Sequence, residues 1–223
     1  MKINLTHSFF KNTVVAKSLY TDVSKSGTWI SRVVRIAEKI EKDPKSVPFI
    51  STKIEPKDIA NDFRGAAFEG FGEALIKLMG SIPQIGIYDY EPYTGPDYGV
   101  DGVGKGKNGK IATVQFKFRG EFDKVLTSKD DHLGNFVSAS LEKPFEVSID
   151  DNENMLILTT GKEVFYKDMS IEWKNKVKYI AQNQSWGCFR GQKYKPEDPT
   201  NTFSLKSLVD NNLAFWNQVY ESV

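Results

Sequence analysis

The segment that most constrains the fold is residues 98–119, which reads YGVDGVGKGKNGKIATVQFKFR. Asn108 and Gly109 near its middle favour a two-residue type I′ turn, because both central positions of that turn need a positive φ angle. After the turn, apolar side chains alternate with polar ones, as in a strand that buries one face. The sequence therefore predicts a β-hairpin whose core-facing side chains on the second strand are Ala112, Val114, Phe116 and Phe118.

The other face of the second strand carries an amide at Gln115 and a cation at Lys117, and Asp101 lies on the preceding strand. The turn falls nearly midway between Asp101 and Gln115, so these two side chains could lie across the hairpin from each other. A carboxylate, an amide oxygen and the Phe116 backbone carbonyl are oxygen ligands of the kind that suit Mg²⁺, with Mn²⁺ as a substitute. Lys117 would orient a water molecule or stabilise charge on a phosphoryl group.

Two stretches of this segment, Gly99-Val100-Asp101 and Val114-Gln115-Phe116-Lys117, carry a resemblance to a known family. The chain resembles the PD-(D/E)xK nuclease superfamily, and in particular its Mrr-like restriction-endonuclease branch, whose pattern is G-(I/V)-D, a hairpin and (V/I)-Q-x-K. The resemblance implies a restriction-endonuclease-like α/β fold with a mixed central sheet of four to five strands flanked by helices. Gln115 is the Q-x-K variant found in that branch. Its neutral amide removes one negative charge and is expected to weaken metal binding.

A helix is predicted over residues 59–80, where apolar side chains recur at helical spacing, and it carries Glu69 and Glu73 one turn apart. In the Mrr-like pattern, a helix before the hairpin supplies a glutamate to the metal site within an F-E context. Glu69, which follows Phe68, matches that context better than Glu73 does. The resemblance thus implies Glu69 as a ligand and Glu73 as the alternative ligand or a neighbouring acid, whereas both could instead be surface carboxylates.

Other interpretations of the site remain open. Asp97 stands in a literal Pro-Asp pair and is an alternative to Asp101, because the hairpin register is inferred. Gln115 and Lys117 could also be the solvated face of an antiparallel strand, with Asp101 a turn acid.

Periodicity along the rest of the chain predicts further elements. A helix over residues 132–141 should pack Leu133, Phe136, Val137 and Ser140 against the core, and the apolar run within residues 152–160 should form a buried strand parallel to the Q-x-K strand. This order extends the resemblance to about residues 63–161. A first strand is expected at residues 84–90, a loop at 184–202, and helices at 21–42, 170–182 and 204–220.

These elements suggest three regions in the 223-residue chain: an N-terminal helical extension (1–55), a nuclease core (56–165) and a C-terminal helical region (166–223) for packing, dimerisation or DNA contact. The formal net charge of +1 means that any DNA contact must come from local patches. The candidate DNA-binding residues are Lys105, Lys107, Lys110, Arg119, Arg190 and Lys193. Lysines at an exposed hairpin tip can equally serve solubility alone.

A single cysteine excludes an intramolecular disulfide and a multi-cysteine zinc site, which fits a reducing, cytoplasmic setting. No signal peptide or membrane span is expected. We expect a bacterial or phage-encoded protein, or one associated with the host nucleoid.

The function implied by the resemblance is a metal-dependent DNA endonuclease of restriction, homing or phage-encoded type. It would hydrolyse phosphodiester bonds with Mg²⁺ or Mn²⁺, and a homodimer is a candidate assembly because double-strand cleavage usually needs two active sites. Two alternatives come from other classes. The chain could be a catalytically inactive DNA-binding or interaction module on a nuclease-like fold, or an unrelated α/β protein in which Q-x-K is accidental.

Overall fold

The structure is a computed structural model that describes residues 2–20, 28–46, 55–96, 99–121, 123–127, 133–148, 154–165, 177–181, 185–186, 204–209 and 212–223. The chain forms two compact units, one of Met1–Ala74 with Val209–Val223 and one of Leu75–Leu208. These limits differ from the regions expected at 1–55, 56–165 and 166–223, because most of the long helix after residue 55 packs within the first unit.

The first unit is helical. Its elements are η1 (Ser8–Lys11), α1 (Thr13–Tyr20), α2 (Thr28–Lys42), η3 (Pro44–Ser46), most of α3 (Pro56–Met79) and α7 (Leu213–Ser222). Buried aromatic rings from three of these helices pack together: the Trp29 ring lies 4.6 Å from that of Phe71 and 6.2 Å from that of Trp216. Helix α3, over Pro56–Met79, confirms the helix predicted over residues 59–80. The helix expected at residues 21–42 is observed over its described part.

The C-terminal helix expected over residues 204–220 is instead two helices, α6 (Leu205–Val209) and α7, and residues 210–211 lie outside the described ones. Asn212 is the N-cap of α7, and its side-chain oxygen accepts a hydrogen bond from the Phe215 amide at 3.1 Å. Asparagine favours this cap over a helix interior, because its side chain replaces a missing backbone partner. The apolar residues keep helical spacing across both helices, so the sequence pattern did not reveal the break between them.

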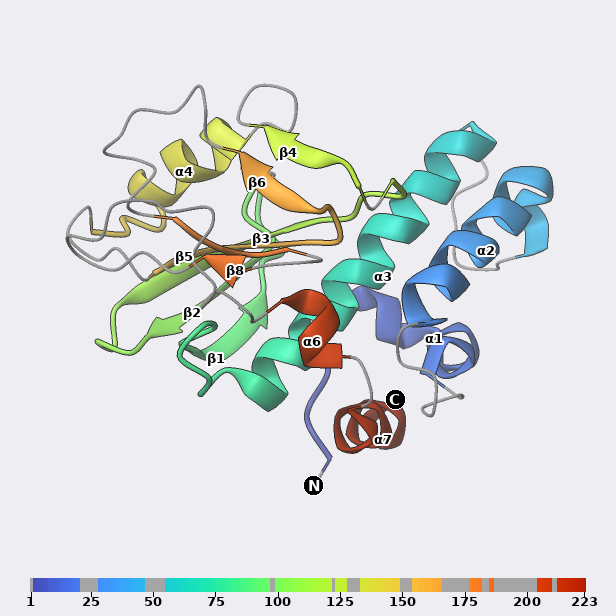
Figure 1. Cartoon of the computed structure of the whole chain (residues 1–223), viewed down its shortest axis with the longest axis horizontal. Coiled ribbons are helices and arrows are strands. Elements are labelled where there is room, and N and C mark those ends of the chain that lie inside the picture. The colour runs from blue at the N-terminus through green and yellow to red at the C-terminus, as the bar shows by residue number, and fades with distance from the viewer. Residues whose placement is uncertain are drawn as a thin grey trace. The chain divides into compact units, whose positions relative to one another are not determined.

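The second unit contains a six-stranded sheet in the order β1 (Ile87–Pro92), β2 (Gly102–Gly106), β3 (Ile111–Lys117), β5 (Met155–Thr159), β7 (Lys178–Ile180) and β8 (Ser185–Trp186) (Figure 1). The pairs β1–β2, β2–β3 and β7–β8 are antiparallel, whereas β3–β5 and β5–β7 are parallel. The expected α/β class with a mixed sheet flanked by helices is confirmed. Five strands have three or more residues and β8 has two, and a separate parallel pair joins β4 (Val125–Thr127) to β6 (Glu163–Phe165).

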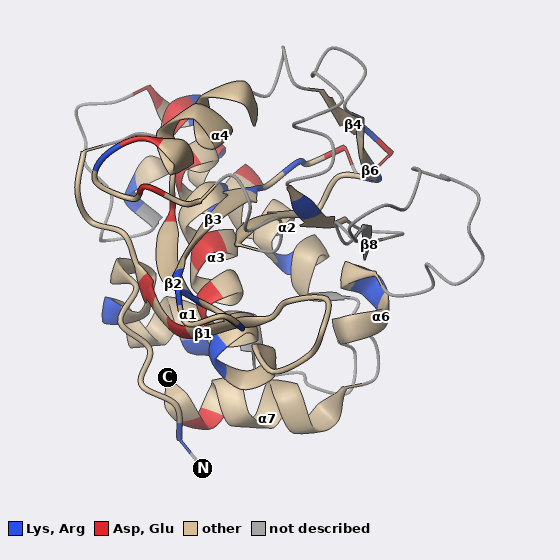
Figure 2. Ribbon diagram, turned by 90° about the vertical axis from the view of Figure 1, so that its left-hand side faces the viewer, with Lys and Arg blue, Asp and Glu red and all other residues tan. Residues whose placement is uncertain are grey.

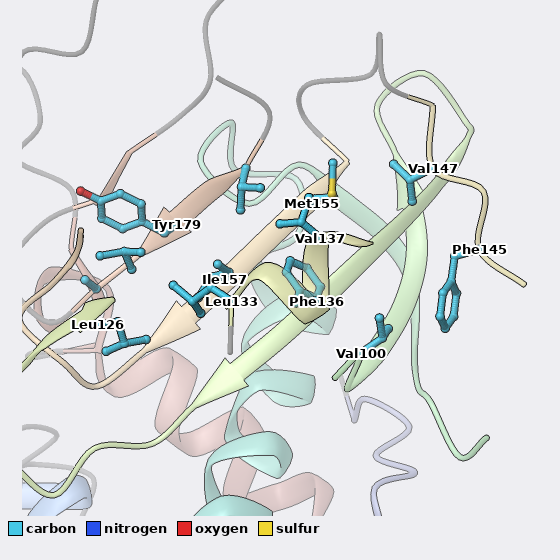
Figure 3. Packing of buried hydrophobic residues seen from close by; sticks show 13 residues of the cluster. Val100, Leu126, Leu133, Phe136, Val137, Phe145, Val147, Met155, Ile157 and Tyr179 are labelled. Atoms are coloured by element: carbon cyan, nitrogen blue, oxygen red, sulfur yellow. The ribbon is translucent and has the colours of Figure 1, made fainter. Parts of the chain in front are cut away.

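Helix α4 (Leu133–Leu141) buries Leu133, Phe136, Val137 and Ser140, the four residues expected on its core face. Figure 3 shows the Phe136 and Val137 side chains beside those of Met155 and Ile157 from β5. The parallel pairing of β3 with β5 is also as expected, with Gln115 opposite Ile157. The predicted order of hairpin, helix and parallel strand is therefore correct.

The helix expected over residues 170–182 is wrong for the described part of that segment, because residues 178–180 form strand β7. Val177, Tyr179 and Ala181 join the hydrophobic cluster around α4. This alternation has the two-residue period of a strand, and pairing with β5 rather than local sequence preference decides the conformation.

The hairpin is confirmed, but its turn is not type I′. Gly106 N donates to Lys110 O at 2.9 Å, and Gly109 N donates to Gly106 O at 2.9 Å, which leaves a three-residue loop. Of the two central positions of the expected turn, Gly109 has a positive φ angle, 76°, whereas Asn108 does not. The geometry is that of a turn followed by a left-handed residue, which is the next most common hairpin loop after the two-residue turns.

We expect Gly109→Ala to destabilise the protein by about 1–2 kcal/mol, because an L side chain is disfavoured in the left-handed region. Gly120 is the matched control, since neither a positive φ angle nor a neighbouring atom within 4 Å opposes a Cβ there. Gly120→Ala should be neutral or stabilise by up to about 1 kcal/mol. Urea unfolding of both variants measures the difference, and equal effects would contradict the loop assignment.

Candidate functional site

The candidate site lies where β2 separates from β3. The ladder pairs Gly102 with Val114, and the Asp101 amide donates to Val114 O at 2.9 Å. Beyond this point the Phe116 amide donates to Asp101 Oδ2 at 2.6 Å. The Asp101 carboxylate thus takes the place of a backbone acceptor on the diverging strand. The expectation that Asp101 and Gln115 lie across the hairpin from each other agrees with this geometry.

Gln115 is buried, with 1% of its surface exposed, and its Nε2 donates to Gly99 O at 2.8 Å. Gly99 has a φ angle of 74°, which turns the chain so that its carbonyl reaches the amide. A carbonyl oxygen only accepts, so the amide nitrogen must face Gly99 and the orientation of the side chain is fixed. Among the described residues, Gln115 Oε1 is buried and has no hydrogen-bond partner.

An unpaired buried acceptor costs about 1–3 kcal/mol. Gln115 Oε1 is held in place by the bond that its own Nε2 makes, so it cannot turn toward another donor without breaking that bond. An electropositive group next to Gln115 Oε1 would remove this cost. The Asp101 carboxylate, the Gln115 amide oxygen and the Phe116 carbonyl are oxygen donors of the kind that a hard cation prefers.

The expected burial pattern of β3 requires a correction. The face that carries Thr113 and Gln115 was predicted to lie opposite the core, yet these residues are 0% and 1% exposed, and Ala112, Val114 and Phe116 on the other face are also buried. β3 is a central strand of the sheet, and α4 covers its Gln115 side, where Ser140 Oγ lies 2.8 Å from Thr113 Oγ1. The solvated-face interpretation is therefore wrong for Gln115.

Lys117 is the last residue of β3 and is half-buried. Its side chain follows Gln115 on the same face of the strand, since side chains alternate with a period of two. Within the described part of the chain, no hydrogen bond or ion pair engages the Lys117 ammonium group. The site thus brings together Asp101, Gln115 and the adjoining Phe116 backbone, with Lys117 two residues further along the strand.

Glu69 and Glu73 belong to the first unit and bind its N-terminal segment. Glu73 is completely buried and accepts hydrogen bonds of 2.7 Å from Thr6 N, Thr6 Oγ1 and His7 N. Glu69 Oε2 lies 2.8 Å from His7 Nε2, while His7 Nδ1 accepts from Phe9 N at 3.1 Å. Nδ1 therefore carries no proton, and Nε2 is the donor to Glu69. The surface-carboxylate interpretation is wrong for Glu73, and no sequence pattern pointed to its partners in residues 6 and 7.

The candidate DNA-binding residues differ in their surroundings. Lys105 is exposed and its Nζ lies 2.9 Å from Asp89 Oδ2. Lys107 and Lys110 are exposed at the hairpin tip, and Arg119 is half-buried with Nη1 donating to Phe118 O at 2.9 Å. Figure 2 shows basic and acidic positions mixed along the described ribbon. The predicted site residues outside the described part are Asp97, Arg190 and Lys193.

Among the described residues, no three histidine, cysteine, aspartate or glutamate side chains gather as a metal-binding group. The candidate donor set at β2 and β3 is of another kind, because it combines one carboxylate with an amide and a backbone oxygen. No described helix has the length and apolar character to cross a membrane. Comparisons with models of protein families, with curated proteins and with solved structures found no match to this chain.

We expect Glu73→Gln to destabilise the protein by about 2–4 kcal/mol, because hydrogen bonds to a buried carboxylate are strong and an amide nitrogen would face one of the three donors. Glu69→Gln is the control and should cost less than about 1 kcal/mol, since a Gln oxygen can still accept from neutral His7. Urea unfolding measures both. If Glu73→Gln leaves the free energy of unfolding unchanged, the N-terminal segment does not depend on this carboxylate.

Proposed function

We propose that this chain is a metal-dependent deoxyribonuclease that hydrolyses DNA phosphodiester bonds. The observation that carries the proposal is the buried, unpartnered Oε1 of Gln115, the residue before Phe116, whose amide binds the Asp101 carboxylate; Lys117 ends the same strand two residues after Gln115. A purely structural glutamine at a central strand would be expected to pair both ends of its amide. An unpartnered oxygen on a strand that binds a carboxylate and ends in a lysine is instead suited to binding a cation and a phosphate.

The order of elements supports the same proposal. Helix α3 precedes three antiparallel strands, and α4 then leads to β5, which is parallel to β3. This is the order that the resemblance to the Mrr-like branch of the PD-(D/E)xK superfamily implies, and the Q-x-K residues lie on β3 as it requires. Fold and function remain separate questions, so the site residues carry the functional argument.

In the proposed mechanism, Asp101, Gln115 Oε1 and the Phe116 carbonyl would hold Mg²⁺ or Mn²⁺. The metal would supply Lewis-acid stabilisation of negative charge on the phosphoryl group. Lys117 orients the attacking water and stabilises the developing charge on the phosphate oxygens. Asp101 Oδ2 also fixes the strand on which Gln115 and Lys117 stand, through its bond with Phe116 N.

The further assignments belong to the same proposal. Glu73 keeps its structural role, and Asp97 is the alternative to Asp101. Lys105, Lys107, Lys110, Arg119, Arg190 and Lys193 contact the DNA backbone. Cleavage of both strands would use a homodimer of a cytoplasmic protein.

A second candidate function is a DNA-binding module without catalysis. The neutral amide at Gln115 favours it, because the site carries one negative charge fewer than a pair of carboxylates and so attracts a cation less strongly.

We expect the wild-type protein to cleave plasmid DNA with Mg²⁺ or Mn²⁺ and to be inactive with EDTA. Lys117→Ala should lower the cleavage rate by at least about 10²-fold, as expected when a group that stabilises transition-state charge is removed. Lys57 is exposed on α3 and belongs to the first unit, so Lys57→Ala serves as the control and should retain the wild-type rate. Gel analysis of supercoiled and linear plasmid measures the rates.

A wild-type protein that shifts DNA in a gel but cleaves nothing with either metal would favour the second candidate. Equal activity of Lys117→Ala and wild type would contradict the site assignment.

Metal binding can be measured without DNA. We expect Mn²⁺ to raise the melting temperature in a saturable way, since a ligand at about 100 times its Kd stabilises the folded state by about 2.7 kcal/mol. Asp101→Asn should abolish this increase, because the negative charge that attracts the cation is lost. The fold should be kept, since the amide oxygen of Asn can still accept the hydrogen bond from Phe116 N. Asp123→Asn, at an exposed aspartate, is the matched control and should keep the increase. A Mn²⁺ effect that is unchanged in Asp101→Asn would show that the cation binds elsewhere.

A further inference from the structure

Two buried threonines at the end of β5 form a network with the backbone that follows Gln115. Thr159 and Thr160 are both 0% exposed. Thr159 Oγ1 donates to Lys117 O at 2.7 Å, and Thr160 N reaches the same carbonyl at 3.3 Å. The carbonyl of Lys117 is thus held by two donors from the neighbouring strand.

Thr160 Oγ1 holds the chain two residues further on. It accepts from Arg119 N at 2.6 Å and donates to Arg119 O at 2.9 Å. One hydroxyl therefore replaces both backbone partners that a neighbouring strand would offer to Arg119. The segment from Lys117 to Arg119 is fixed at both ends, although β3 itself ends at Lys117.

The proton positions in this network are determined by its own partners. Gly161 N donates to Thr159 Oγ1 at 3.0 Å, so the hydroxyl accepts there and directs its proton to Lys117 O. Gly161 also permits a close approach, because a Cβ at this position would lie 2.9 Å from Lys124 O and 2.5 Å from the Leu126 side chain. The turn after β5 is thereby seated closely against residues 124–126.

We propose that Thr159 and Thr160 are positioning residues that fix the backbone of Lys117 and so aim its ammonium group at the scissile phosphate. This inference rests on the proposed nuclease function. A residue at the end of a strand frays unless its backbone groups are paired, and a displacement of about 1 Å at a catalytic group can lower a rate by about 10²-fold. The threonine hydroxyls supply that pairing at the point where the β3–β5 ladder stops.

The test compares Thr160→Val and Thr159→Val, which remove a hydroxyl at nearly constant volume, with Thr160→Ser, which keeps it. We expect each valine variant to lower kcat for plasmid cleavage by about 10- to 100-fold. The KM for DNA and the half-saturating Mg²⁺ concentration should not change, since Asp101 and Gln115 are left in place. Thr160→Ser should recover most of the wild-type kcat.

Thr113→Val is the matched control. It removes an equally buried hydroxyl from the same strand as Lys117, but that hydroxyl contacts Ser140 on α4 and not the Lys117 backbone. Its kcat should remain at the wild-type value. All rates are measured at a temperature at which circular dichroism shows each variant folded. If Thr160→Val does not fold, the kcat of Thr159→Val tests the positioning role.

The outcomes separate this inference from the function on which it rests. A wild-type protein without metal-dependent cleavage overturns the proposed function. If the wild type is active and Lys117→Ala is not, wild-type kcat in the valine variants overturns only the positioning role. An equal loss of kcat in Thr113→Val would show that the sheet is loosened in general and would overturn the positioning role. A changed Mg²⁺ requirement in Thr159→Val or Thr160→Val would overturn it as well.

Discussion

The hydrogen bond from the Phe116 amide to Asp101 Oδ2, 2.6 Å long, closes the ladder where β2 leaves β3. A bond to a charged acceptor contributes about 1.5–3 kcal/mol, which is about the cost of the unpaired Gln115 oxygen beside it. The separation of the strands lets the Gly99 carbonyl reach the Gln115 amide and fixes its orientation. One carboxylate thus holds the central strand at the point where the β2–β3 ladder ends.

The two units divide the acidic residues by role. In the first unit, Glu73 is buried and its oxygens are occupied by three donors from Thr6 and His7, so its charge stabilises the N-terminal segment. In the second unit, Asp101 accepts a backbone amide with one oxygen and stands next to a glutamine whose oxygen lacks a partner. Burial alone therefore does not separate a structural acid from the acid of the proposed site. The two differ in that the oxygens of Glu73 have donors, whereas Gln115 Oε1, on the strand that Asp101 binds, has none among the described residues.

Hydrophobic periodicity in the sequence correctly predicted the elements whose conformation depends on neighbouring residues in the chain. The helical period predicted α3 and the four buried residues of α4, alternation predicted the hairpin, and an unbroken apolar run predicted the buried strand β5. Tertiary contacts decided the rest. Gln115 is buried because α4 covers a face that looks polar in the sequence, and β7 is a strand because β5 offers it partners. The bond between Asp101 and the Phe116 amide lies where the hairpin register brings the two strands together, whereas the threonine network beyond Lys117 depends on a strand distant in sequence.

If Asp101 and Gln115 hold a divalent cation, as proposed, diffraction from crystals grown with Mn²⁺ should locate it. Anomalous scattering identifies Mn²⁺ independently of how the rest of the site is interpreted. We expect an anomalous peak at about 2.0–2.2 Å from Gln115 Oε1 and from an Asp101 carboxylate oxygen, as is usual for oxygen ligands of a small divalent cation. A Gln115 Oε1 that is paired with a protein donor, with no anomalous peak beside it, would show that these residues do not hold a cation.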